Sequence, residues 1–325
     1  MNYEFIKIYL NIKYMIKILI AILIIIIIFY VTNYLLKKKE NFENMEYGTF
    51  NSDDNNSDNN RIIWMYWETL PGKSKPGYID LCIESVKFNC GKCFKIIVLD
   101  NNKILEYLPE LDMSEISHLS LPQRVDYYRY CLLEKYGGVW LDADILVIKC
   151  ICPFFKKLKN YDYVGFGCGF DRKKCKTIDK AYSRPLNWFM ISKKNTPFIQ
   201  CVKNSAYEKI MEYKDANLKL PYHSIGKVIL NECYEKLNTD GKEWNYEHIP
   251  SKCQEYDSDG NKLNNILIDF EWKDCSKERI FFPLYNTAPG YPDWFKQLTS
   301  KKLKESNLYL KPLIIQAFEK KKLCN

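Results

Sequence analysis

Histidine is scarce in this chain of 325 residues, which has only His118, His223 and His248. Cysteine is more frequent, but Cys90 and Cys93 form the one Cys-x-x-Cys pair. A structural zinc site needs four Cys or His ligands at short spacings, so the shortage of partners disfavours zinc at this pair. A disulfide or two unpaired thiols are the alternatives. Because the cysteine count of 13 is odd, the cysteines cannot all pair within one chain, and they do not fix the compartment.

The sequence also lacks a concentrated basic patch. Its formal net charge of +8 is spread along the chain, and the lysine run at 320–322 is typical of a solvated face. No RNA- or DNA-binding motif accompanies these charges, so we expect no nucleic-acid partner. A diffuse positive charge remains compatible with a substrate that carries phosphate.

One long apolar run lies near the N-terminus. Residues 18–31 are all apolar, and the run continues to residue 36 with Thr32 and Asn33 as weak interruptions. A helix of this length covers roughly 28 Å, about one hydrocarbon core. The run is longer than the apolar part of a signal peptide, and no small-x-small cleavage site follows it. After a short tail at 1–17, we therefore predict an uncleaved transmembrane signal anchor at 18–36 rather than a cleaved signal peptide.

A polar segment follows the predicted anchor. Residues 37–60 are rich in Asn, Asp, Glu and Ser and have few apolar side chains to bury, so we predict a disordered stem. Lysines flank the apolar run on both sides, and the positive-inside rule therefore gives no orientation. The folded domain is expected at 61–325, which is long enough for a substantial core.

Strand-like and helix-like segments alternate through the predicted domain. Strands are expected at 61–67, 94–100, 139–149, 163–167 and 187–192, and shorter ones near 246–250 and 280–285; helices are expected at 76–89, 121–136, 196–214 and 222–237. This alternation favours one α/β domain of Rossmann-like type with a mixed, mostly parallel sheet.

Two acids interrupt the apolar segment at 139–149. Asp142 and Asp144 are two residues apart, so in a strand both side chains lie on the same face. Two converging carboxylates repel each other unless a cation or a proton lies between them. In α/β sheets, ligands bind beyond the carboxyl ends of the strands, where a hard divalent ion can bridge carboxylates and substrate phosphates.

The residues around these acids resemble a known family signature. The segment LPQRVDYYRYCLLEKYGGVWLDAD (121–144) contains Asp126 and Arg129, a Gly-Gly turn, Trp140 and the D-x-D pair. This pattern resembles the DXD-containing glycosyltransferases of GT-A fold. It is most similar to the family of the yeast initiating α-1,6-mannosyltransferase (glycosyltransferase family 32) and to the capsular polysaccharide synthesis glycosyltransferases. Segments 61–68 and 187–199 resemble further parts of these families, and the match covers most of 61–250.

The resemblance implies a role for each residue of the signature. Asp144 would ligate Mn²⁺ or Mg²⁺ at the donor diphosphate, and Asp142 would reach the ribose, or the metal through water. Asp126 and Arg129 would hold the nucleotide-sugar. The plain alternative for Asp126 and Arg129 is a surface ion pair one helical turn apart.

Three more positions are implied less directly. Trp67 would stack on the base, although an aromatic at a strand end is equally well explained as core. Asn187 would approach the sugar or the acceptor. His223 is a candidate further metal ligand, although structural histidines are the default.

The resemblance therefore implies a hexosyltransferase. It would use a UDP- or GDP-hexose donor and a glycan, protein or lipid acceptor, with retention of anomeric configuration, in a Golgi, ER or other internal membrane if the source is eukaryotic or viral. One alternative is a membrane-anchored, non-catalytic sugar-binding domain of the same fold. Another is a phosphatase of haloacid dehalogenase type, which carries its D-x-D on the first strand.

Overall fold

The computed structural model describes residues 61–167, 186–239, 246–250, 280–284, 291–308 and 310–319. All of them belong to the second of two compact units, Met1–Phe50 and Asn51–Asn325. The predicted tail, anchor and stem at 1–60 lie outside the described residues. Within the described ranges, no helix has both the length and the apolar character to cross a membrane.

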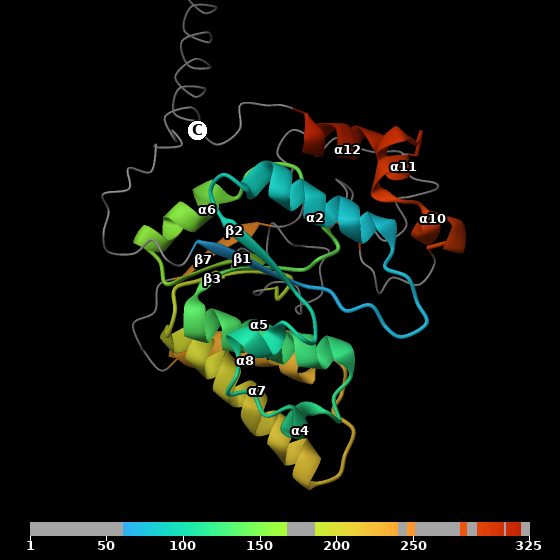
Figure 1. Ribbon diagram of the computed structural model, residues 1–325. Helices are drawn as coiled ribbons and strands as arrows, with labels where there is room; N and C mark the ends of the chain where they lie inside the picture. The colour runs from blue at the N-terminus through green and yellow to red at the C-terminus, as the bar shows by residue number, and fades with distance from the viewer. Residues whose placement is uncertain are drawn as a thin grey trace, which may run out of the picture. The chain divides into compact units, whose positions relative to one another are not determined.

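The elements alternate as the sequence predicts, and Figure 1 shows their arrangement. In chain order they are β1 (Ile62–Tyr66), α2 (Gly77–Cys90), β2 (Lys95–Leu99), α3 (Ile104–Tyr107), α4 (Met113–Ile116), α5 (Leu121–Tyr136), β3 (Gly138–Leu141), β4 (Ile145–Val147), α6 (Cys152–Lys156), η2 (Lys157–Lys159), β5 (Tyr163–Gly167), β6 (Phe189–Ser192), α7 (Pro197–Asp215), η4 (Ser224–Val228), α8 (Ile229–Thr239), β7 (Tyr246–Pro250), β8 (Phe281–Pro283), α10 (Asp293–Gln297), α11 (Ser300–Glu305) and α12 (Lys311–Phe318).

The main sheet is mixed, as predicted. Its described strands are ordered β2-β1-β3-β6-β5-β7. The pairings β1–β2, β1–β3 and β5–β7 are parallel, whereas β6 is antiparallel to both β3 and β5. Because β1, β2 and β3 all run in one direction, their carboxyl ends meet at one edge of the sheet. This edge is where the sequence places a binding crevice.

Helices cover both faces of the sheet (Figure 1). Successive side chains of a strand point to opposite faces, and β1 has apolar residues on both. Ile63 and Met65 pack into the core shared with α2, α11 and α12. Trp64 and Tyr66 pack into the core shared with α5, α7 and α8. A strand buried on both faces explains why 61–67 is almost continuously apolar.

Local features fix the ends of α5. Ser120 and Gln123 form a capping box at its start, with Ser120 N–H donating to Gln123 Oε1 at 3.1 Å. At its end, Gly137 and Gly138 adopt φ angles of 67° and 96°, which side chains other than glycine rarely tolerate. A Cβ at Gly137 would also lie 2.8 Å from the backbone nitrogen of Lys194. The Gly-Gly pair therefore turns the chain directly from α5 into β3.

The prediction of one strand at 139–149 is wrong. β3 ends at Leu141, and β4 starts at Ile145 and pairs with β8 in a separate two-stranded sheet. The chain turns between them, with Ile145 N–H donating to the Asp142 carbonyl at 3.3 Å. The helix predicted at 222–237 is likewise interrupted, because η4 contains a non-helical residue, Gly226 (φ −85°, ψ −110°).

The cysteines are divided between thiols and disulfides. Cys90 and Cys93 are both free thiols, which is one of the two alternatives for this pair. Cys201 of α7 and Cys233 of α8 form a disulfide that joins two helices on the same face of the sheet. The α7–α8 pair is therefore held by a covalent link in addition to its apolar contacts.

Candidate functional site

A cleft of about 880 Å³ lies beyond the carboxyl ends of β1 and β3. The structure brings every predicted site residue to its wall: Trp67, Asp126, Arg129, Asp142, Asp144, Asn187 and His223. These residues come from a strand end, a helix, a turn and two loops. The sequence pattern therefore predicted the membership of the cleft, whereas the roles of the residues stay predictions.

A tight turn presents the two acids. The N–H of Asp142 donates to the Trp188 carbonyl at 2.9 Å, and the Asp144 carbonyl accepts from the N–H of Leu284 at 2.8 Å. With the bond from Ile145 to Asp142, these contacts fix the backbone of the turn at three points. The two side chains therefore reach the cleft from a turn, and not from alternate positions of a strand as the sequence suggested.

Arg129 links the helix α5 to this turn. Its Nη2 lies 2.8 Å from Asp126 Oδ1, and its Nη1 lies 3.3 Å from Asp142 Oδ1 and donates to the Asn187 carbonyl. The guanidinium lies 4.9 Å from the centre of the Trp140 ring, and Trp140 Nε1 donates to Asp142 Oδ1 at 2.7 Å. The Arg129 side chain is only 5% exposed. The pair of Asp126 and Arg129 is therefore a buried ion pair and not a surface one.

Burial and charge both shift the pKa values of this network. Burial raises the pKa of Asp126 to about 6; Arg129 opposes this shift and Asp142 adds to it. Burial also raises the pKa of Asp142, against the effect of Arg129. Burial acts to lower the pKa of Arg129, but Asp142, Asp126 and the nearby Asp144 outweigh it. Two carboxylates thus pair with one guanidinium, and a third lies near it, an arrangement compatible with a bound cation.

Gly226 and Asn187 complete the surroundings of Asp126. Asn187 Nδ2 donates to Asp126 Oδ1 at 3.0 Å. A Cβ at Gly226 would lie 2.5 Å from Asp126 Oδ2, so only glycine fits beside the carboxylate. Tyr130 fixes this backbone by donating from its hydroxyl to the Gly226 carbonyl at 3.2 Å. Sequence reasoning missed Gly226, although a glycine inside a helical pattern is a signal of close packing.

Trp67 and His223 lie on the wall of the cleft in different settings. Trp67 is half-buried and packs against the core of the α2 face, as its core interpretation predicts, whereas its stacking on the base stays a prediction. Its indole Nε1 has no hydrogen-bond partner among the described residues. The His223 ring lies 4.7 Å from that of Tyr222. In the described ranges, no set of three ligand atoms from Asp142, Asp144 and His223 lies within 4.8 Å.

A second hollow of about 660 Å³ adjoins the first. Both hollows are lined by Pro122 and Tyr222. The second is otherwise formed by residues at the start of α5 and by residues at and after the end of α7, among them Tyr213 and Lys214 of α7. The Tyr222 side chain is 51% exposed at the junction. Tyr222 therefore borders both hollows.

An α/β domain with an acidic cleft at the carboxyl ends of its parallel strands is a ligand-binding domain of Rossmann-like type. A family model described as capsular polysaccharide synthesis protein matches residues 25–274, and the chain belongs to this family. This part of the resemblance is confirmed, whereas the likeness to the yeast mannosyltransferase family stays a prediction. No curated protein matches the chain.

Solved structures of two enzymes are similar to this chain. One is the PaToxG glycosyltransferase, at 14% sequence identity, with 56% of this chain and 71% of that chain covered and a TM-score of 0.36. The other is the galactosyltransferase LgtC in complex with donor and acceptor sugar analogs. It is 14% identical, with 59% and 74% of the two chains covered and a TM-score of 0.33. These TM-scores are too low to support a functional conclusion.

Proposed function

We propose that this protein is a metal-dependent glycosyltransferase that moves a hexose from a UDP- or GDP-hexose to a glycan, protein or lipid acceptor. The observation that carries the proposal is the buried Arg129 between Asp126 and Asp142, beside Asp144, at the edge where α/β sheets bind ligands. Membership of the capsular polysaccharide synthesis family supports glycan assembly as the setting.

The carboxylates of the turn fit a divalent cation. The family resemblance makes Asp144 the primary ligand, with Asp142, whose Oδ1 accepts from Trp140 and pairs with Arg129, beside it. Mn²⁺ and Mg²⁺ prefer such oxygen ligands and keep positions for phosphate. When bound, the cation supplies positive charge to the nucleoside diphosphate that leaves.

The remaining side chains bind and orient the donor. Trp67 offers an aromatic wall to the base. Asp126 and Asn187, already bonded to each other, present an acceptor and a donor to sugar hydroxyls. Arg129 is buried behind them and holds both carboxylates in position, so its own contribution is orientation.

The second hollow is where we place the acceptor. It continues the donor cleft past Tyr222, whose exposed ring can stack on a sugar. Retention of configuration and the N-terminal membrane anchor belong to the same proposal. They rest on the family resemblance and on the apolar run at 18–36.

The test is donor turnover by the full chain in detergent. Nucleoside diphosphate release from a panel of UDP- and GDP-hexoses is measured with Mn²⁺ and with EDTA. We expect activity with one donor, its loss in EDTA, and a fall of roughly 100-fold in Asp144→Asn. Asp162→Asn, which changes a half-exposed acid paired with Lys193, is the matched control and keeps full activity.

Three outcomes contradict the proposal. Nucleoside diphosphate release that is undiminished in EDTA excludes a role for the cation. Phosphate release from simple phosphomonoesters favours the haloacid dehalogenase alternative. Glycan binding without turnover of any donor favours a non-catalytic sugar-binding domain.

A further inference from the structure

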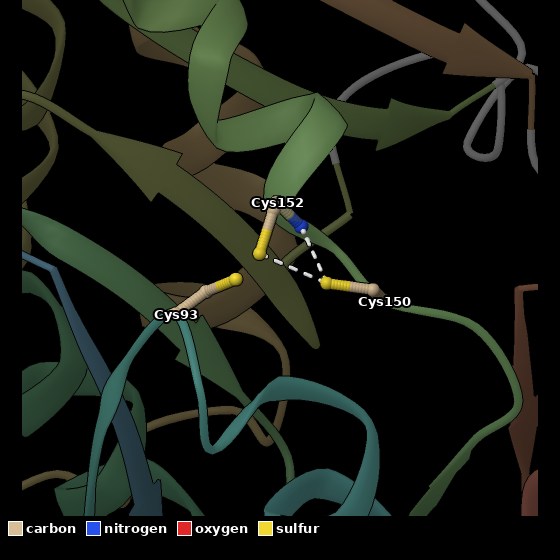
Figure 2. A group of neighbouring side chains, drawn as sticks. All are labelled: Cys93, Cys150 and Cys152. Atoms are coloured by element: carbon tan, nitrogen blue, oxygen red, sulfur yellow. Dashed lines mark hydrogen bonds between the residues drawn. The ribbon is translucent and has the colours of Figure 1, made fainter. Parts of the chain in front are cut away.

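Three cysteine sulfurs converge at the end of the sheet opposite to the cleft. Cys93 directly precedes β2, and Cys150 and Cys152 follow β4. Figure 2 shows the three side chains pointing toward one another. Their Sγ atoms all lie within 4.8 Å of one another, and those of Cys150 and Cys152 are 2.9 Å apart. The N–H of Cys152 also donates to Cys150 Sγ at 3.4 Å.

The three sulfurs are in two oxidation states. Cys150 is part of a disulfide, whereas Cys93 and Cys152 are free thiols. A metal ion binds thiolates, and a disulfide sulfur is a poor ligand. In this state the group is therefore not a three-thiolate metal site. It is a dithiol in contact with a disulfide.

Cys93 has the surroundings of a reactive thiol. A hydrogen bond from the Cys152 thiol lowers the pKa of Cys93 to about 7; burial opposes this shift, and Arg61, Lys156 and Lys92 assist it. Cys93 is only half-buried. By contrast, Cys131 is a free thiol of α5 that packs into the core on the other face of the sheet, and burial raises its pKa to about 12.

We propose that Cys93, Cys150 and Cys152 form a thiol–disulfide exchange site. The Cys93 thiolate accepts the proton of Cys152 while Cys152 Sγ attacks Cys150 Sγ. A Cys150–Cys152 disulfide forms, the previous partner of Cys150 leaves as a thiolate that is protonated by water, and Cys93 returns its proton to water. Cys93 then attacks Cys152 Sγ, which forms Cys93–Cys152 and releases Cys150 as a thiolate.

These steps need no external oxidant or reductant. Each step breaks one disulfide and forms one, so the number of disulfides stays constant. The attacking and attacked sulfurs are already in contact, which removes most of the entropic cost of bringing them together. The exchange site is independent of the proposed glycosyl transfer, because none of its three cysteines lines the cleft.

The test is a disulfide map of the full chain, incubated without oxygen at pH 7 with a chelator and no reductant. Samples are acid-quenched over minutes to hours, alkylated and analysed by mass spectrometry. In the wild type we expect Cys150–Cys152 and Cys93–Cys152 peptides to appear beside the original Cys150 linkage. Cys93 should react with iodoacetamide at least tenfold faster than Cys131.

The variants separate the steps. Cys152→Ser should keep a single Cys150 linkage, and Cys93→Ser should slow formation of Cys150–Cys152 and abolish Cys93–Cys152. Cys131→Ser, which changes a buried thiol elsewhere, should exchange like the wild type. A wild-type map with one unchanging Cys150 linkage overturns the proposal. So does one equivalent of zinc in the purified chain with all three cysteines reduced. The wild-type time course decides the question even where a variant fails to fold.

Discussion

At the scale of single residues, Arg129 holds the side chains of the cleft in position. It is buried between Asp126 and Asp142, and the Asn187 carbonyl accepts from it as well. A buried guanidinium is costly to desolvate, so it persists only where carboxylates and carbonyls surround it. Its fixed fork makes two acids on different elements act as one unit.

Arg129→Ala should lower the free energy of unfolding by about 3 kcal/mol, because it leaves the largely buried Asp126 and the partly exposed Asp142 without a counter-charge. Lys135→Ala is the matched control on the same helix. It removes a more exposed ion pair with Glu110, and we expect a loss below about 1 kcal/mol. Urea denaturation measures both. Equal effects of the two variants would contradict the buried-pair interpretation.

Asp126 should make stability depend on pH. Burial raises its pKa from its ordinary 3.8 to about 6, so between these values the folded chain holds a proton that the unfolded chain has lost. The contribution of Asp126 to the free energy of unfolding is therefore present below about pH 4 and falls as pH rises to about 6. The shift corresponds to roughly 3 kcal/mol.

Asp126→Asn isolates this contribution. The free energy of unfolding of the wild type minus that of the variant should fall between pH 4 and pH 7, measured by urea denaturation at each pH. A difference in the free energy of unfolding that stays constant from pH 4 to pH 7 would exclude the raised pKa of Asp126.

At the scale of elements, two interruptions create the cleft. The turn between β3 and β4 presents the acids, and the non-helical Gly226 in η4 lets the chain pass beside Asp126. The sequence predicted regular elements at both places. An apolar run on both sides of the D-x-D is consistent with one strand, and only the pairing of β4 with β8 reveals the break.

Gly226→Ala should lower donor turnover at least tenfold, because the new Cβ meets Asp126 Oδ2 at 2.5 Å and displaces the carboxylate. Overpacking should also cost about 1–3 kcal/mol of stability. Val228→Ala changes a half-exposed residue of the same element and should keep wild-type turnover. A folded Gly226→Ala protein with normal turnover would show that the position of Asp126 is unimportant.

At the scale of the whole molecule, periodicity was the strongest predictor. The α/β class, the mixed sheet and most element bounds followed from apolar spacing and from Gly, Pro and Asn signals. Four of the seven predicted residues that line the cleft belong to the compact signature at 121–144, and the other three come from segments elsewhere in the chain. The contacts within the cleft did not follow from the sequence, because they join residues far apart in the chain.

The sulfur group illustrates the same limit. Cys93, Cys150 and Cys152 have no informative spacing in the sequence, and the fold alone brings them together. The antiparallel entry of β6 between β3 and β5 also had no local signal, because strand direction depends on the path of the whole chain.

The most direct test of the central claim is calorimetric titration of UDP and GDP into the full chain, with and without Mn²⁺. We predict that one nucleotide binds tightly only when Mn²⁺ is present, and that Asp144→Asn abolishes this binding while Asp162→Asn keeps it. Binding of the nucleotide with equal affinity without Mn²⁺, or unchanged binding by Asp144→Asn, would contradict the account.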